Sequence, residues 1–466
     1  MWPPRSSFES GVRAARCLMR PRALRQSHRQ PSSWLRRVPS RSRCSAKSSW
    51  IGPISSVLGS RPCITMTPEV FNEVLASDRR TTMRAGADFS FTEEQLMLRD
   101  SVRRFVREQV PEEYARKCDQ EKIAPLDTFD KIAEMGWLGI GIPEEYGGAG
   151  LGFTELGIVL EELSYGLLEL SVLVYRATVH GAQSLLTYGS EEQRRKYLPL
   201  IAAGKFKSSM SLTEPNAGSD AAGIQTRAVR DGDYYIINGS KIFNSQVDLA
   251  TRTVLVTRTD PSLPQHKGMS LFFVDPHSPG VTIRRLDTLC FRSVGTNSVS
   301  YDNVRVHKDD LLGELNSGWK HLMTNLTKER FSVAAQVTGA AQNALDCALQ
   351  YAKDRIQFGQ PIGKFQVIQH KLADMQTQVH ISRLMTYDLA RRLDAKIECR
   401  KEASMAKIYT CEAYHRVADE GMQILGGYSM MPDFPMERHY RDSRIMRIGG
   451  GSSEVMRTSI AKDLGL

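Results

Sequence analysis

Apolar positions recur with two different periods along the chain, and the change of period divides the sequence. From about residue 89 to 204 they recur three and four positions apart, which is typical of amphipathic helices. Between 208 and 306 they form short alternating runs, and from 319 to 466 the helical period returns over longer segments. The pattern predicts helices, then a sheet, then helices.

The middle region contains five runs with strand character, separated by Asp-Gly, Pro and Gly-Ser turn signals. These runs are Tyr234–Asn238, Thr253–Thr257, Ser270–Val274, Val281–Arg285 and Ser298–Val306. Short runs joined by tight turns are typical of antiparallel pairing, so we expect an antiparallel sheet here.

These patterns predict an α+β fold that is mainly helical. We expect a leader at 1–66, an N-terminal helical domain at 89–204, a central β domain at 205–315 and a C-terminal helical domain at 316–466. The glycine-rich run Gly147–Gly152 does not have the GxGxxG spacing, and no strand precedes it. We therefore interpret it as a loop and not as a dinucleotide site.

The net charge of +10 arises in the leader. Residues 1–66 contain 12 Arg, one Lys and one acid, Glu9, so the remaining 400 residues have a net charge of −2. The basic balance therefore gives no support for nucleic-acid binding by the folded part. A leader rich in Arg and Ser resembles a mitochondrial transit peptide. The alternative is a start codon placed too far upstream, with Met66 or Met83 as the true start.

Cysteine usage and hydropathy exclude several classes of protein. Five of the eight cysteines follow the leader, and none forms a CxxC pair, which argues against a disulfide framework or a zinc site. From the cysteine pattern we expect no metal, and because no run of 18 or more apolar residues occurs we expect no integral membrane segment.

Two segments beside the predicted sheet have ligand-binding chemistry. Leu212–Asp220 reads LTEPNAGSD, in which small residues allow close backbone approach and hydroxyls supply donors. In Lys241–Ser245, an aromatic and a hydroxyl two positions apart on a strand should share a face, where they could stack on and bond to a ring system. Taken alone, the first segment also fits a polar turn and the second a core strand.

Three further segments lie in the C-terminal region: Arg355–Gly359, Gln423–Gly427 and Ile448–Glu454. In the last of these, glycines precede a serine that could cap a helix. Exposed amides at such a helix start would suit an anion or a carbonyl oxygen, although a flexible hinge is the alternative.

Together and in this order, the segments resemble the acyl-CoA dehydrogenase family over about residues 89–466. The TEPNAGSD run, and the QILGG run followed by Arg441 and Asp442, match the family's two best-known motifs. The resemblance implies an α-helical domain, a β-barrel-like sheet domain and a C-terminal four-helix bundle. It also implies bound FAD and a homotetramer.

The resemblance also implies roles for individual residues. Thr213 corresponds to a hydroxyl that bonds the flavin ring, and Phe243 and Ser245 stand where many members have Trp and Thr. The implied cofactor-binding set is Met210, Leu212, Thr213, Gly218, Ser219, Phe243, Ser245, Arg355, Phe358, Gln366, Gln423, Gly426, Gly427, Ser452 and Glu454. Some of these usually reach a neighbouring subunit's FAD. The implied substrate-binding set is Ser219, Arg330 and Gly450.

The position of the catalytic base departs from the common pattern. Many members carry a Glu before the terminal helix, where this chain has Gly450. In isovaleryl-CoA and long-chain acyl-CoA dehydrogenases the base lies instead on the first helix of the C-terminal domain, directly before an Arg. Glu329 before Arg330 matches that placement, so we expect Glu329 to remove the α-proton.

The resemblance implies that the chain oxidises an acyl-CoA to its trans-2-enoyl-CoA and that electron-transfer flavoprotein reoxidises the flavin. Two alternatives stay open: enoyl-CoA reduction on the same fold, and a low-turnover role in assembly. The second is suggested by Gly426-Gly427-Tyr428-Ser429, where the family has Gly-Gly-x-Gly. The expected location is the mitochondrial matrix, or the bacterial cytoplasm if the start is misassigned.

Overall fold

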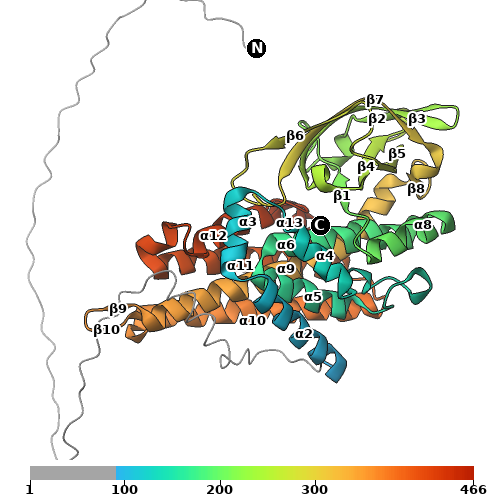
Figure 1. The fold of residues 1–466 in the computed structure, drawn as a ribbon. Helices are drawn as coiled ribbons and strands as arrows, with labels where there is room; N and C mark the ends of the chain where they lie inside the picture. Colours follow the sequence, from blue (N-terminus) through green and yellow to red (C-terminus); the bar gives the residue numbers. More distant parts are fainter. Residues whose placement is uncertain (1–90) are drawn as a thin grey trace, which may run out of the picture. The chain divides into compact units, whose positions relative to one another are not determined.

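The part of the chain that the structure describes begins with a capped helix. The computed structural model describes residues 91–466, so the predicted leader lies outside the described residues. Thr92 caps helix α2: its hydroxyl accepts from the N–H of Gln95, whose side chain accepts from the Thr92 amide. The N-terminal region comprises α2 (Glu93–Gln109), α3 (Glu112–Glu121), α4 (Leu126–Glu134), α5 (Phe153–Gly166), α6 (Leu168–Tyr175), the π-helical segment η3 (Arg176–Gln183), α7 (Ser184–Tyr188) and α8 (Glu191–Ala202) (Figure 1).

An eight-stranded sheet follows, in the order β6-β7-β3-β2-β4-β5-β8, with β1 paired to β4. Its strands are β1 (Ser208–Ser211), β2 (Arg227–Asp231), β3 (Tyr234–Ser245), β4 (Arg252–Arg258), β5 (Met269–Val274), β6 (Val281–Leu286), β7 (Thr296–His307) and β8 (Leu311–Leu312). Most neighbours are antiparallel, while β4 pairs in parallel with β1 and β2. The five predicted strand runs are confirmed.

Strands β4 and β5 are buried on both faces. Along β4, Val254 and Val256 belong to the core shared with the helices, whereas Leu255 between them belongs to the core inside the sheet region. On β5, Phe273 and Phe272 divide in the same way. Two buried faces explain why these runs are continuously apolar instead of alternating.

Three long helices, α9 (Gly318–Asp354), α10 (Gln366–Asp394) and α11 (Arg400–Leu425), pack together after the sheet (Figure 1). The hairpin β9 (Ile356–Gln357) and β10 (Gln360–Pro361) joins the first two, and η8 (Gly426–Met430), α12 (Met436–Met446) and α13 (Ser453–Asp463) complete the chain. Helix α5 also packs on α9 and α10. A Cβ at Gly339 of α9 would lie 1.9 Å from the Glu161 carbonyl oxygen of α5, so only glycine permits this approach. The mainly helical α+β prediction is confirmed.

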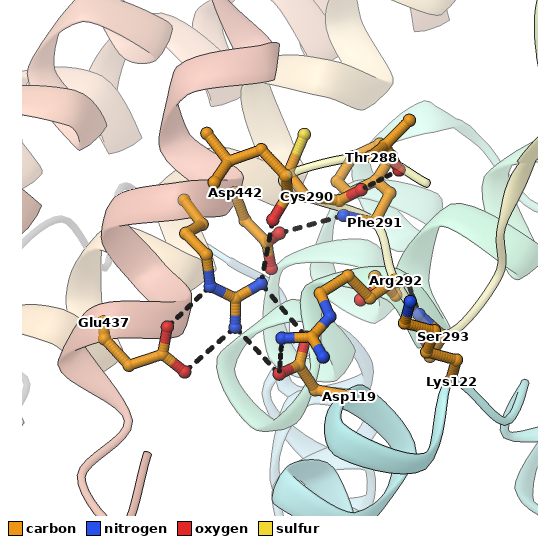
Figure 2. Close-up of polar contacts among 12 residues, drawn as sticks. Asp119, Lys122, Thr288, Cys290, Phe291, Arg292, Ser293, Glu437 and Asp442 are labelled. Atoms are coloured by element: carbon orange, nitrogen blue, oxygen red, sulfur yellow. Dashed lines mark hydrogen bonds and ion pairs between the residues drawn. The ribbon is translucent and has the colours of Figure 1, made fainter. Parts of the chain in front are cut away.

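Arg441 of α12 joins three parts of the chain. Its guanidinium donates to both carboxylate oxygens of Asp119 in α3, at 3.2 and 2.8 Å, and to the Leu289 carbonyl oxygen in the β6–β7 loop, at 3.1 Å. It also pairs with Glu437 one turn earlier on α12. Figure 2 shows Asp119 and Glu437 on different helices, with the β6–β7 loop beside them. The bidentate contact between Arg441 and Asp119 fixes the orientation of the two side chains as well as the distance between them.

Two neighbouring buried carboxyl groups hold the same loop. Asp442 accepts the Phe291 N–H at 3.1 Å (Figure 2), and one oxygen of Glu169 on α6 accepts the N–H groups of Ser293 and Val294, both at 2.9 Å. Burial raises the pKa of Asp442, and the neighbouring Glu169 raises it further. The folded state therefore favours the protonated form of Asp442.

We expect Asp442→Asn to become more stable relative to wild type as the pH rises. A carboxyl whose folded pKa exceeds its unfolded value of about 3.9 binds a proton preferentially in the native state, so wild-type stability falls as pH rises through that window. An amide does not titrate there and keeps an oxygen for the Phe291 N–H. Chemical unfolding at about pH 5 and about pH 9 measures the difference.

Asp100→Asn is the control, because that side chain is 67% exposed. Its stability difference from wild type should be the same at both pH values. A flat difference for Asp442→Asn would contradict the assignment of a raised pKa to this carboxyl group.

Candidate active site

The structure brings together the two positions that sequence comparison offered for the base. Glu329 lies on α9 with 13% of its side chain exposed, and Gly450 lies in the loop between α12 and α13. A Cβ built at Gly450 would lie 3.1 Å from Oε1 of Glu329. The carboxylate of Glu329 therefore fills the space into which a side chain at 450 would project.

The glycine loop has a backbone that favours glycine. Gly450 and Gly451 have φ values of +64° and +93°. The buried Lys407 of α11 donates to the Gly451 carbonyl oxygen at 2.6 Å. Ser452 then caps α13 by accepting the Val455 N–H at 3.3 Å, as the sequence predicted. These contacts hold the C-terminal end of the loop beside Glu329, which disfavours the hinge alternative.

Three side chains from the end of α6 and the start of η3 surround the carboxylate. Nε2 of His180 lies 3.4 Å from Oε2 of Glu329 and 2.8 Å from the Tyr175 hydroxyl. The Arg176 guanidinium lies 3.2 Å from Nδ1 of the same ring. The cluster presents donors and positive charge to the carboxylate.

Burial raises the pKa of Glu329, but its surroundings more than offset this effect. A hydrogen bond from His180, the positive charge of that ring when it is protonated, the positive charge of Arg176 and a hydrogen bond from Tyr175 lower the pKa to about 2. Arg330, the next residue along α9, also interacts electrostatically with Glu329, but His180 and Arg176 are the main charged groups that lower the pKa of Glu329.

The side chain of Arg330 makes its hydrogen bond in a different part of the protein from that of the adjacent Glu329. Its side chain is buried and donates to the hydroxyl of Ser404 on α11 at 3.0 Å. Among the described residues its Nε has no partner. Contact between Arg330 and a substrate stays a prediction.

The two segments predicted to meet a flavin lie side by side. The N–H of Ile242 on β3 donates to the Thr213 carbonyl oxygen at 2.9 Å. Behind them, the buried Lys241 donates to Glu214 and to the Leu212 carbonyl oxygen, both at 2.8 Å. Met210 is half-buried on β1, while Gly218 and Ser219 are exposed in the following loop.

The expected shared face of Phe243 and Ser245 is wrong. The register of β3 against β7 shifts between Lys241 and Asn244, and Phe243 has φ +60°. This bulge interrupts the two-residue period. As a result, Phe243 is 63% exposed and Ser245 is buried. An exposed aromatic ring beside the Thr213 segment still suits stacking on a planar ligand.

Most of the remaining predicted cofactor residues gather around the β9–β10 hairpin and the end of α11, whereas Ser452 and Glu454 lie at the start of α13. An open cavity of about 570 Å³ there is lined by Tyr351, Arg355, Gln357, Ile362, Ile424, Leu425, Gly426, Gly427, Tyr428 and Met431. Phe358 is 94% exposed at the hairpin tip, and Gln366 and Gln423 are exposed nearby on α10 and α11. The structure thus separates the residues around Thr213 and Phe243 from those around the hairpin.

The hairpin group lies far from Glu329 in one chain. Glu329 and Arg355 are joined by the continuous helix α9, which at about 1.5 Å per residue separates them by roughly 40 Å. Figure 1 shows the hairpin at the end of the long helices away from the sheet. A single dinucleotide therefore cannot reach from Glu329 to the Arg355 cavity within one chain.

Sequence reasoning missed Tyr175, Arg176 and His180. They precede Glu329 by about 150 positions, in a segment whose pattern shows only a helix. A weak signal existed: the ring of a lone histidine four residues after an arginine can lie on one helical face with it. Nothing local indicated that this face would meet Glu329.

Three models of one family match the chain in order. They describe the acyl-CoA dehydrogenase N-terminal domain at residues 92–205, the middle domain at 209–304 and the C-terminal domain at 316–465. The chain belongs to the acyl-CoA dehydrogenase family. Members are FAD-dependent oxidoreductases, which confirms the expected cofactor and enzyme class.

Known acyl-CoA dehydrogenase relatives cover nearly all of the described part. "Probable acyl-CoA dehydrogenase YngJ" of Bacillus subtilis is 38% identical over 81% of this chain and 99% of its own length. "Caffeyl-CoA reductase-Etf complex subunit CarC" of Acetobacterium woodii is 37% identical over 80% of this chain and 98% of its own. The structure of butyryl-CoA dehydrogenase from Megasphaera elsdenii has a TM-score of 0.78, with 31% identity over 82% of this chain and 100% of that one.

Membrane-spanning helices, metal-ligand clusters and disulfides are also expected to be missing from this acyl-CoA dehydrogenase. Within residues 91–466, no helix combines the length and apolar character needed to cross a membrane. The same residues contain no group of three or more His, Cys, Asp or Glu side chains placed to hold a metal. The five cysteines after the leader are free.

We expect Gly450→Ala to destabilise the enzyme by about 1–2 kcal/mol, the usual cost of a left-handed backbone at a residue with a Cβ. The added methyl group would also press on Oε1 of Glu329. Gly449→Ala is the matched control, because its nearest neighbour lies at an ordinary 3.6 Å and its φ is not positive. Chemical unfolding of both variants measures the effect, and equal costs would contradict this account.

Proposed function

We propose that this enzyme removes two hydrogens from the α and β carbons of an acyl-CoA thioester, with Glu329 as the base. One observation carries the proposal: the Glu329 carboxylate occupies the space beside Gly450 where many family members have their catalytic Glu. Because the two positions reach the same point, the chemistry does not require a side chain at 450.

Each proposed step uses a feature of the site. FAD, when bound, supplies the acceptor for the β-hydride. Glu329 is ionised because its pKa is lowered, so it is ready to take the α-proton. The Gly450 amide needs no side chain to donate to the thioester carbonyl oxygen, and such a contact typically contributes about 2.7–4 kcal/mol at the transition state.

We also propose that Thr213, Phe243 and their neighbours hold the flavin ring, while the Arg355–Gly427 cavity serves the FAD of another copy of the chain. The roughly 40 Å between Glu329 and Arg355 supports this division, since one dinucleotide cannot span it. The proposal requires at least a homodimer, and we expect the tetramer that the family resemblance implies.

The direction of reaction and the electron carrier are further parts of the proposal. We propose oxidation of the acyl-CoA, with electron-transfer flavoprotein as the acceptor. The relative CarC is by its name a subunit of a caffeyl-CoA reductase–Etf complex. That name makes enoyl-CoA reduction the second candidate. The mitochondrial location rests on residues 1–66, outside the described part, and stays a prediction.

We expect Glu329→Gln to keep FAD and acyl-CoA binding. The rate at which acyl-CoA bleaches the flavin should fall by at least about 100-fold, because the amide cannot accept the α-proton. Anaerobic stopped-flow spectroscopy with butyryl-CoA, isovaleryl-CoA and longer straight chains measures the loss and the chain preference together. Crotonyl-CoA added to the reduced enzyme tests the reverse direction.

Glu314→Gln, an exposed change near the start of α9, is the control and should bleach like wild type. Bleaching of Glu329→Gln at the wild-type rate would rule out Glu329 as the base. A wild-type flavin that no acyl-CoA bleaches and no enoyl-CoA reoxidises would overturn the proposed reaction.

The shared-site proposal predicts complementation between defective chains. Arg355→Ala should lose FAD because the partner's cofactor lacks its contact, whereas Glu329→Gln retains FAD but not activity. Co-expressed with different tags and purified as hetero-oligomers, the two chains should form some complete sites and regain activity. Hetero-oligomers no more active than the separate variants would contradict the sharing of sites between subunits.

A further inference from the structure

Three polar pairs join α9 to the segment made of η3 and α7. The six side chains occupy every fourth position on each segment: His321, Asn325 and Glu329 on α9, and Tyr188, Ser184 and His180 on the other. The first pair stacks with ring centroids 4.0 Å apart, and the Asn325 amide donates to the Ser184 hydroxyl. The third pair is Glu329 and His180. The contact between Glu329 and His180 is therefore part of a regular helix–helix interface.

The partners of His180 determine its tautomer. A guanidinium can only donate, so the Arg176 contact at 3.2 Å requires Nδ1 of His180 to be an acceptor. The neutral ring then carries its proton on Nε2, the atom that faces Glu329 and the Tyr175 hydroxyl. Burial and the positive charge of Arg176 both lower the pKa of His180, against the opposite effect of Glu329. The ring is therefore a neutral donor at neutral pH.

We propose that His180, held in the Nε2–H form by Arg176, is a positioning residue that orients the Glu329 carboxylate and sets how tightly it binds a proton. The single Nε2–H of His180 is shared between the Tyr175 hydroxyl at 2.8 Å and Oε2 of Glu329 at 3.4 Å, and Tyr175 donates its own proton to Glu329. The inference rests on Glu329 being the base. It assigns a role in the reaction to a part of η3, and π-helical segments are frequently found at functional sites.

Other charged groups near Glu329 act from different elements. Arg330 lies on the same helix but turns toward Ser404 of α11. Lys407 of α11 interacts electrostatically with Glu329 but is bonded to the Gly451 carbonyl oxygen. Lys328 donates to uncharged side-chain oxygens on η3 and α7. Only the Arg176–His180–Tyr175 chain of donors ends on the carboxylate among the described residues.

The role of this chain predicts how the carboxylate titrates when donors are removed. Burial raises the pKa of Glu329, so loss of its donors should leave that effect unopposed. We expect His180→Leu and Arg176→Met each to raise the protonation midpoint of Glu329 by about one to three units. His180→Gln keeps an N–H donor of similar reach, so it should stay closer to wild type.

Infrared spectroscopy of the FAD-loaded protein measures this midpoint without turnover. The carboxyl C=O band assigned to Glu329 is the one that Glu329→Gln abolishes. Because the pKa of Glu329 is about 2 in wild type, the band should be nearly absent at about pH 3.5, whereas in His180→Leu and Arg176→Met, with midpoints about one to three units higher, it should be clearly present at that pH. The control is His321→Gln, which changes a buried histidine two helical turns away in the same interface and should leave the band as in wild type.

Flavin bleaching by butyryl-CoA or isovaleryl-CoA separates orientation from proton affinity. At about pH 9 Glu329 is ionised in every variant, so a rate still reduced by roughly 10- to 100-fold in His180→Leu reports a misplaced carboxylate. Recovery of most of that rate in His180→Gln supports the positioning role. Equal rates for His180→Leu and wild type at that pH would overturn it.

The remaining outcomes are also decisive. A band unchanged in both His180→Leu and Arg176→Met would overturn the proposal, and so would an equal shift in His321→Gln. If the midpoint shifted in His180→Leu but not in Arg176→Met, the part of the proposal that assigns a role to Arg176 would be wrong. If no acyl-CoA bleaches the wild-type flavin, the proposed function fails, while the infrared titration still reports whether His180 acts on Glu329.

Discussion

The active site depends on the junction at which Arg441 holds Asp119. Glu329, Gly450 and the Thr213 segment belong to parts of the chain that are far apart in sequence, so their alignment requires that helices and sheet keep a fixed relation. The Arg441–Asp119 pair fixes α3 to α12, and the adjacent carboxyl groups of Glu169 and Asp442 hold the β6–β7 loop against both helical regions. Removing one partner of such a buried ion pair usually destabilises the fold by far more than the intact pair stabilises it, because the other charge stays buried and unpaired.

A buried carboxylate is unstable without compensation, and here the compensation has chemical consequences. Full desolvation would hold Glu329 protonated, which is the wrong state for a base. A neutral imidazole donor backed by a guanidinium stabilises the anion without placing a full positive charge in direct contact with it. This arrangement keeps the carboxylate ionised and directional, and it leaves the other oxygen, Oε1, toward Gly450.

Much of the fold could be predicted from sequence, because periodicity and turn residues are local signals. The strand runs from Tyr234 to Val306 and the cap at Ser452 are examples. Glu329 could be nominated only through family resemblance, since a Lys-Glu-Arg run on a helix has no distinctive pattern of its own. The bulge at Phe243 and the approach of His180 to Glu329 depend on register and on tertiary packing, which no short stretch of sequence encodes.

The closeness of position 450 to the Glu329 carboxylate limits how such an enzyme can change over evolutionary time. Two acidic side chains projecting into one small volume would repel each other and crowd, so a lineage cannot simply acquire the second before discarding the first. Exchange of one base for the other must pass through an ancestor with a smaller residue at one of the sites. The order of substitutions is thus dictated by available space, and a glycine with left-handed backbone geometry marks the side of the cleft that was vacated or never filled.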